Sequence, residues 1–593
     1  MSTPSEEYRQ RLQARESRAA HYEAIHIRLG NIRLVLFVSA VVIAWEAFHA
    51  HRFSASWLAV PVAAFVAVAA FHSRILRARD LARRAIGFYN AGLARIEDRW
   101  AGTGQTGERF ADPHHVYAAD LDLFCPGGLF ELLSTARTRI GEERLAAWLL
   151  APSPVERILE RHASVAELRD QLDLREDLAI LGEDARVGVH PEKLMQWAEA
   201  PNRMEWPPLR LLATVLAVLA VIAVVVWGYW GTLTPLLLVV LTEGVVIFRL
   251  RKPMEEVLHG AEHALRDLEL LSGVLARVEQ HNFQAPRLLV LRRELGPSEG
   301  GASRAIARLR TLGDLIDSRD NLFVRILDLP LMYSVQLALA AERWRRAHGP
   351  QVRQWLHAIG EIEAMLSLAA YSYEHPADPF PEFVDGAACL DGDDLGHPLL
   401  RAAACVRNDV KVCGEARVLL VSGSNMSGKS TLLRSVGINV VLAMAGAPVR
   451  ARRLRLTPLR AGASIRINDS LQEGSSRFYA EITRLRRLFD LTGDRPPLLF
   501  LLDELLQGTN SKDRRIGAEG VVRALLERGA IGLLSTHDLA LTEIGGALDG
   551  HLRNVHFQDE FVDGKMTFDY KLRDGVVTKS NGLELMRSIG LDV

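Results

Sequence analysis

The chain has 593 residues, enough for several domains, and its charges nearly cancel. Its 71 Lys and Arg residues stand against 72 Asp and Glu residues, a formal net charge of −1. This balance excludes a protein that binds nucleic acid through overall basicity, although it does not exclude a local basic groove. Four scattered cysteines form no Cys-x-x-Cys pair, so we expect reduced thiols in a cytosolic compartment rather than a zinc site. They are Cys125, Cys389, Cys405 and Cys413.

Residues 1–31 are predicted to form a charged cytoplasmic helix, followed by a first transmembrane hairpin over 32–72. Its arms, 34–48 and 57–71, are apolar but short for full membrane spans. Arginines precede the first arm and follow the second, which is the positive-inside pattern with both ends of the hairpin in the cytoplasm. Residues 73–119 are then expected to be a cytoplasmic helical connector.

Residues 209–250 are predicted to form a second transmembrane hairpin. No charged residue occurs in 211–242, and about 20 apolar residues suffice for a helix to cross a bilayer. Glycines and aromatic residues at 228–232 suit a turn at the membrane interface. Glu243 weakens the returning arm, because a carboxylate inside a membrane is costly. The competing interpretation is that both hairpins are buried in a soluble core. We expect four helices in the cell (inner) membrane, with the rest of the chain facing the cytoplasm.

The remaining chain divides into helical and mixed regions. Helical periodicity covers 120–150 and, after a break at Pro152 and Pro154, 155–181, and long helices are expected over 254–283, 302–346 and 352–373. A proline-rich linker at 376–381 precedes a region in which apolar strands alternate with helices. The fold class is therefore α followed by α/β.

One glycine-rich loop stands between a predicted strand at 417–422 and a helix at 432–444. It fits the pattern G-x-x-x-x-G-K-[ST], whose backbone N–H groups and helix N-terminus surround nucleotide phosphates. The matching residues are Gly423, Ser424, Asn425, Met426, Ser427, Gly428, Lys429, Ser430 and Thr431. Lys429 would reach the β- and γ-phosphates and the Ser430 hydroxyl would bind Mg²⁺, so ATP and Mg²⁺ are the expected ligands.

Two further strands end in polar residues of the kind that an ATPase needs. The strand at 497–502 is followed by Asp503, placed to bind Mg²⁺ through water, and Glu504, placed as a general base. The strand at 531–536 ends at His537, which fits a sensor of the γ-phosphate. A purely structural role for these three side chains is the alternative.

Together these motifs resemble the MutS family of ABC-type ATPases. Asn425-Met426 within the loop, Asp503-Glu504 and Ser535-Thr536-His537 are similar to the family's forms of these motifs. The segment 469–481 resembles its signature loop, in which Gly474, Ser475 and Ser476 would reach the nucleotide of the opposite subunit. The resemblance implies a MutS-like all-α core/lever domain over 120–208 and 251–385, and a MutS-type ABC ATPase domain over 386–593.

The chain also departs from the family's pattern. The region before residue 120 leaves no room for a mismatch-recognition domain, and no aromatic residue near Cys405 and Val406 is available to stack on adenine. Two groups of arginines could contact DNA phosphates or be paired within the protein, and both interpretations stay open. They are Arg450, Arg452, Arg453, Arg455, Arg484, Arg486 and Arg487.

The function implied is that of a membrane-anchored ATPase that forms a homodimer around two nucleotides and binds mismatched or irregular DNA. One alternative is a membrane scaffold or signalling ATPase without DNA binding. Another is an ABC transporter, which four spans and the Ser475-Ser476 signature do not favour.

Overall fold

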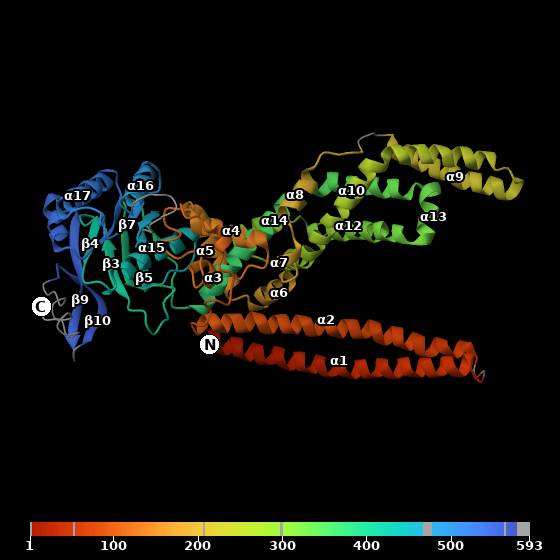
Figure 1. Ribbon diagram of the computed structural model, residues 1–593, viewed down its shortest axis with the longest axis horizontal. Coiled ribbons are helices and arrows are strands. Elements are labelled where there is room, and N and C mark those ends of the chain that lie inside the picture. The colour runs from red at the N-terminus through yellow and green to blue at the C-terminus, as the bar shows by residue number, and fades with distance from the viewer. Residues whose placement is uncertain are drawn as a thin grey trace.

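The computed structural model describes residues 3–50, 52, 54–204, 208–296, 301–466, 477–548, 550–562 and 565–577. Helices form the chain up to Glu374, and the strands follow, gathered at one end of an elongated molecule (Figure 1). This order confirms the predicted change from α to mixed α and β structure. The predicted domain boundaries themselves stay predictions.

The α-helices before the strands are α1 (Pro4–Phe48), α2 (Ala59–Ile96), α3 (Leu129–Leu133), α4 (Arg139–Leu150), α5 (Val155–Arg169), α6 (Leu172–Gly182), α7 (Ala185–Gly188), α8 (Pro191–Glu199), α9 (Leu209–Trp230), α10 (Thr234–Gln280), α11 (Pro286–Glu294), α12 (Ala302–Asp317), α13 (Leu322–Leu331) and α14 (Tyr333–Glu374). The α-helices of the region that contains the strands are α15 (Lys429–Ala445), α16 (Arg477–Asp490) and α17 (Ser511–Glu527). The short 3-10 helices are η1 (Ala55–Leu58), η2 (Glu108–Phe110), η3 (Ser318–Asp320), η4 (Leu491–Gly493) and η5 (Leu539–Ala547).

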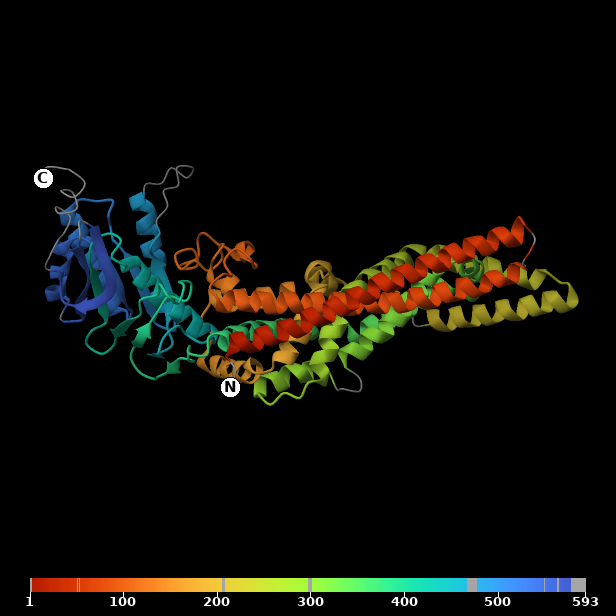
Figure 2. The same cartoon turned by 90° about the horizontal axis from the view of Figure 1, so that it is seen from below.

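Two apolar helical hairpins extend from the helical body in the same direction, away from the strands (Figures 1 and 2). One is α1 with α2, and the other is α9 with the first part of α10. Their outward side chains are apolar and exposed, including Phe37 and Val41 on α1 and Val221 and Val225 on α9. The ends of both hairpins therefore lie on one side of the molecule.

Length and apolar composition allow three described helices to cross a membrane: Pro4–Phe48, Ala55–Ile96 and Leu209–Trp230. The predicted fourth arm belongs to α10 and is not among them, because Glu243, Arg249 and Arg251 interrupt its apolar stretch. A bent pair, α13 with α14, is also sufficiently apolar, but its two parts meet at 76°.

The predicted single helix over 302–346 is wrong. The chain leaves α12, passes through η3 and α13, and turns at Met332, which has a left-handed backbone conformation with φ 46°. Pro330 near the end of α13 favours this break, because proline cannot continue the hydrogen bonding of a helix interior. By contrast, α14 continues through Pro350 for 42 residues, about 60 Å.

Buried polar contacts attach the base of the first hairpin to the end of α14. Glu374 has a fully buried side chain and receives hydrogen bonds of 2.6 Å from both Nε and Nη2 of Arg95. The Tyr8 hydroxyl, also buried, donates to the same carboxylate at 3.2 Å. Arg175 in turn donates to the Tyr8 oxygen at 2.9 Å. These groups join α1, α2, α6 and α14.

The strands form two sheets. The larger has the order β10-β9-β4-β8-β7-β6 and is parallel except for β10, and the smaller has the order β1-β5-β2-β3. The bounds are β1 (Glu382–Phe383), β2 (Leu390–Leu395), β3 (Asn408–Val412), β4 (Val418–Ser422), β5 (Arg453–Leu456), β6 (Arg460–Ser464), β7 (Leu498–Asp503), β8 (Ile531–Thr536), β9 (Leu552–Val562) and β10 (Lys565–Asp574). Strands β4, β7 and β8 are almost fully buried, which explains their continuous apolar sequences.

The expectation of four reduced cysteines is wrong for one pair. Cys389 and Cys413 form a disulfide between the ends of β2 and β3, with their Cα atoms 4.5 Å apart. Leu390 faces Val412 in the antiparallel register, so the neighbouring cysteines are brought opposite each other. The sequence separation of 24 residues gave no sign of this pairing. Cys125 and Cys405 are free thiols.

We expect Glu374→Ala to destabilise the attachment of the first hairpin by about 3–5 kcal/mol, because Arg95 would remain buried without its carboxylate. Limited proteolysis and thermal unfolding of the full chain would show earlier release of residues before α3. Glu199→Ala is the matched control, since Glu199 pairs with Arg353 at the surface. Equal proteolysis of the two variants would contradict this role of Glu374.

Candidate functional site

The carboxyl ends of three parallel strands meet at one edge of the larger sheet. Ser422 at the end of β4 is paired with Thr536 of β8, and Ser535 of β8 is paired with Asp503 of β7. The loops that leave these strands therefore start side by side. Crevices at the carboxyl edge of such sheets are the usual ligand sites of α/β proteins.

The 423–428 loop connects β4 to α15, as the sequence predicted. Gly423 and Gly428 have φ values of 151° and 104°, which disfavour any residue with a side chain. A Cβ atom at Gly423 would also lie 2.8 Å from Ser427 Oγ. Both glycines are thus required for the path that the loop takes from strand to helix.

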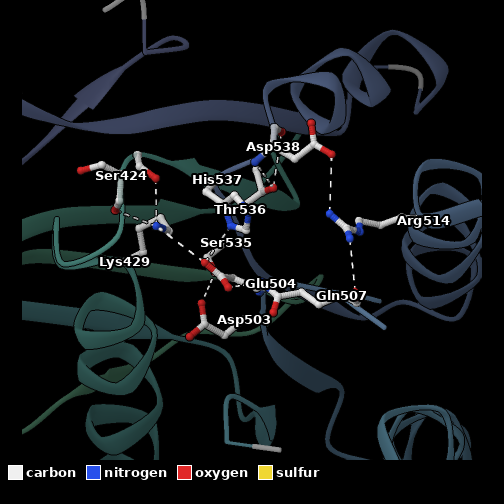
Figure 3. A network of polar contacts seen from close by, with 11 residues as sticks. Ser424, Lys429, Asp503, Glu504, Gln507, Arg514, Ser535, Thr536, His537 and Asp538 are labelled. Carbon is white, nitrogen blue, oxygen red and sulfur yellow. Dashed lines mark hydrogen bonds and ion pairs between the residues drawn. The ribbon is translucent and has the colours of Figure 1, made fainter. Parts of the chain in front are cut away.

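Lys429, the first residue of α15, turns back into the loop (Figure 3). Its ammonium donates to the carbonyl oxygens of Gly423 at 2.9 Å and Ser424 at 2.8 Å. Burial lowers the pKa of Lys429, an effect that the carboxylates of Glu504 and Asp503 partly oppose. A buried cation held mainly by carbonyl oxygens is suited to meeting an anion.

Two buried hydroxyl oxygens beside this ammonium, Ser424 Oγ and Ser427 Oγ, have no hydrogen-bond partner among the described residues. The loop borders a cavity of about 480 Å³, lined by Asn425, Lys429, Ser430 and Thr431, and the two buried hydroxyls lie behind this lining. Buried polar groups are normally hydrogen-bonded, so these hydroxyls indicate a place for an acceptor. A helix N-terminus, an ammonium and free hydroxyls together fit a polyphosphate.

The predicted acidic pair and the histidine are brought to the same place. The Glu504 carboxylate lies 4.0 Å from the Lys429 ammonium and 3.0 Å from His537 Nδ1 (Figure 3). The Gln507 amide donates to its other oxygen. Glu504 has a left-handed backbone with φ 52°, which directs it away from the strand and toward the loop.

Asp503 is fixed separately. Its carboxylate accepts a hydrogen bond from the Ser535 hydroxyl, and the backbone N–H of Glu504 donates to the Ser535 carbonyl at 3.2 Å. The two adjacent acids therefore have different surroundings, with Asp503 against β8 and Glu504 toward Lys429 and His537. This difference permits two separate chemical roles.

The sequence analysis missed the aromatic part of the cavity. Tyr570 of β10 and Phe557 of β9 line it, together with Leu400 and Val406. Tyr570 lies against the loop, since a Cβ atom at Gly428 would be 3.2 Å from its ring. The sequence near Cys405 offers no aromatic residue for this place. Tyr570 lies on the edge strand β10, and its place beside the loop follows only from the pairing of β10 with β9 and of β9 with β4.

Gly474, Ser475 and Ser476 lie outside the described residues, so the structure does not place the predicted signature. The helix that follows it, α16, does reach the site, because Glu481 Oε1 accepts from the backbone N–H of Leu506 just after the acidic pair.

The seven arginines considered for DNA contacts have partners within the chain. Arg450 contacts the buried Asp378, and Arg484 contacts the buried Asp120. The other partners are Asp394 for Arg452, Asp393 for Arg453, Glu382 for Arg455, Asp490 for Arg486 and the His114 carbonyl for Arg487. Each of these arginines thus has a partner within the chain, although Arg452 and Arg486 keep most of their side chains exposed.

Comparison with known proteins supports the sequence resemblance. Residues 419–592 match the family model of MutS domain V. DNA mismatch repair protein MutS 2 of Halobacterium salinarum is 33% identical over 242 residues, which cover 40% of this chain and 27% of that protein. DNA mismatch repair protein MutS of Lactococcus lactis is 30% identical over 240 residues, 39% of this chain and 28% of that protein. The corresponding protein of Geobacillus thermodenitrificans is 30% identical over 266 residues, 44% of this chain and 28% of that protein.

The fold and the site define a helix-rich protein with a MutS domain V at its C-terminal end. This part of the chain is similar in sequence to proteins of the MutS family, in agreement with the resemblance. The chain spans only about a quarter of the length of these curated relatives.

We expect Lys429→Met to stabilise the nucleotide-free protein by on the order of 1 kcal/mol, because it removes a buried charge. At pH values between the lowered pKa of folded Lys429 and the ordinary value of 10.5, the folded protein binds fewer protons at this residue than the unfolded chain does. The stability of the wild type therefore rises with pH in this window, and the advantage of the variant shrinks. Thermal unfolding at several pH values measures this. Lys411→Met, at an exposed position of β3, is the control, and an equal response of both variants would contradict the argument.

Proposed function

We propose that this chain is a membrane-anchored MutS-family ATPase that binds ATP and Mg²⁺ at the 423–431 loop and hydrolyses ATP at a homodimer interface. The observation that carries the proposal is the meeting of Lys429, Asp503, Glu504 and His537 at one sheet edge beside two unpartnered hydroxyls. The match to MutS domain V over the same residues supports it.

Each residue has a distinct role in this proposal. Lys429 and the loop N–H groups bind and orient the phosphates, exchanging the loop carbonyls for phosphate oxygens. Glu504 accepts a proton from the attacking water as general base, while His537 and Gln507 hold its carboxylate in position. The Tyr570 ring offers a face for the adenine base.

Ser430 and Asp503 would hold Mg²⁺, which supplies neutralisation of phosphate charge when bound. No group of three or more His, Cys, Asp or Glu side chains within the described ranges could hold a metal. Few protein ligands are expected for Mg²⁺, because it keeps several waters and takes the rest from phosphates. The donor set of one hydroxyl and one carboxylate therefore fits the ion.

A homodimer is proposed from the family resemblance, with Ser476 of one subunit completing the site of the other. Met426 supports an outward-facing site, since 84% of its side chain is exposed in the middle of the loop. An apolar side chain presented in this way beside the phosphates is suited to a contact with a second subunit.

Membrane anchoring is proposed from the two hairpins. The two hairpins extend the same way (Figure 1), and basic residues flank their apolar stretches: Arg74 and Arg77 follow that of α2, and Arg210 precedes that of α9. One bilayer could thus receive both hairpins, with the sheets in the cytoplasm. We propose the cell (inner) membrane as the location, with four helices entering the bilayer.

DNA binding is proposed at family level, because the relatives are named DNA mismatch repair proteins. The arginines considered above offer no support, since they are paired internally. A second candidate is a membrane scaffold or signalling ATPase without DNA binding. It is favoured by the contact of α13 with α9, because this contact joins the far end of the long helices to a proposed membrane hairpin. An ABC transporter remains the weakest alternative.

We expect Glu504→Gln to bind ATP with nearly normal affinity and to hydrolyse it about 10²–10⁴ times more slowly, because the general base is lost. Single-turnover hydrolysis and equilibrium nucleotide binding by the full chain test this. Lys429→Ala should instead lose binding, since it removes the cation from the loop. Normal turnover by Glu504→Gln would refute the assigned base.

For DNA, we expect the protein in detergent or nanodiscs to shift mismatched or branched duplexes in preference to perfect duplex, with a dependence on ATP. Binding should weaken as salt rises, because phosphate contacts release counterions. Absence of any shift by a preparation that hydrolyses ATP would favour the scaffold or signalling function.

A further inference from the structure

We infer that α13 is an interfacial helix that lies in the surface of the membrane. It would bring the C-terminal end of α12 and the N-terminal end of α14 into contact with the lipid headgroups. This inference rests on the proposed membrane anchoring and adds a third lipid contact to the two hairpins. The lipid contact of α13 was not foreseen from the sequence, in which 302–346 was expected to be one helix.

Helix α13 exposes apolar side chains that a surface helix of a soluble protein would bury. Leu322 and Ile326, one turn apart, are 69% and 66% exposed, and Leu327 and Leu331 are exposed as well. Its acidic side chain points the other way, since Asp328 accepts hydrogen bonds from the N–H of Ser334 at 2.7 Å and its hydroxyl at 2.8 Å. Soluble helices bury the apolar side and expose the polar side. An outward apolar face is what a lipid surface binds.

Helix α13 lies beside the inner end of the second hairpin, where the apolar stretches of α9 and α10 meet the helical body. It contacts both α9 and α10, and the first turn of α14 is joined to the start of α9 by a hydrogen bond of 3.5 Å between Gln336 and Thr214. Met332 and Val335 share a buried cluster with Leu209 and Met254. Helix α13 is therefore level with the first turn of α9 and with the place where α10 leaves its apolar stretch.

The direction of α13 also suits a bilayer surface. It meets α14 at 76°, and it lies across the long axis of the molecule, whereas α1, α2 and α9 run along that axis (Figure 1). If those helices cross the membrane, α13 lies nearly in its plane. Tyr333 fixes this arrangement, because its hydroxyl donates to the Leu315 carbonyl of α12 at 3.1 Å and lies 3.0 Å from Ser318 Oγ.

Charges at the same level favour lipid over another apolar partner. Exposed basic residues lie on α13 and on the two helices that it contacts: Arg325 on α13, Arg210 on α9, and Arg249 and Lys252 on α10. An apolar helix face bordered by cations is the pattern of helices that bind anionic lipid surfaces. The apolar face is also continuous with the exposed surface of α9, which the proposed anchoring already places in lipid.

The test places an environment-sensitive fluorophore on Ile326→Cys in full-length protein carrying Cys125→Ser and Cys405→Ser, reconstituted in vesicles with anionic lipid. Lipids with a quencher near the headgroup should quench this probe roughly twofold more than lipids with a quencher deep in the acyl chains. Val221→Cys in the middle of α9 should show the opposite order, and Leu159→Cys on α5 should respond to neither. Leu322→Cys is a second probe with the same expectation as Ile326→Cys, should one variant not fold.

The outcomes separate the two proposals. Quenching of Val221→Cys with none at Ile326→Cys or Leu322→Cys overturns the interfacial helix and leaves the membrane anchor intact; a second protein copy covering α13 would give this result. Absence of quenching at Val221→Cys overturns the anchor itself, and the interfacial helix with it.

Discussion

Buried acidic side chains at the end of α14 connect the helical part of the chain to the sheets. Glu374 is held by Arg95 and Tyr8 from the first hairpin, and four residues later Asp378 accepts hydrogen bonds from Tyr371 at 2.9 Å and Arg450 at 3.3 Å. Both carboxylates are fully buried, so each depends on these partners for its hydrogen bonds. Any relative movement of helices and sheets must preserve or replace these contacts.

From Arg450 the connection continues to α15, the helix that follows the 423–428 loop. The Arg450 backbone N–H donates to Asn439 Oδ1 at 2.7 Å, and the Asn439 amide donates to the Gly396 carbonyl at 2.8 Å. Asn439 is fully buried on α15, the helix that begins with Lys429. At the other end of the same helix, Arg161 of α5 donates to the Ala445 carbonyl at 2.8 Å, where a cation suits the negative end of the helix dipole. Helix α15 is thus held in its second half through Asn439 and at its C-terminal end by Arg161, so a displacement of this helix acts on α5.

The sequence predicted the site better than the architecture around it. The 423–431 loop, Asp503, Glu504 and His537 could be found because each follows an apolar strand at a recognisable spacing. Tyr570 could not be found in this way, since its position depends on the pairing of distant strands. The Cys389–Cys413 disulfide depends on the register of β2 and β3 in the same manner. Helical periodicity over 302–346 also concealed the turn at Met332, because residues on both sides of the turn favour a helix.

The common direction of the two hairpins constrains how two such chains could assemble. Subunits anchored in the same face of one flat bilayer can be related by a two-fold axis only if that axis stands along the membrane normal. The paired nucleotide sites would then be held at a height set largely by α14, about 60 Å in length.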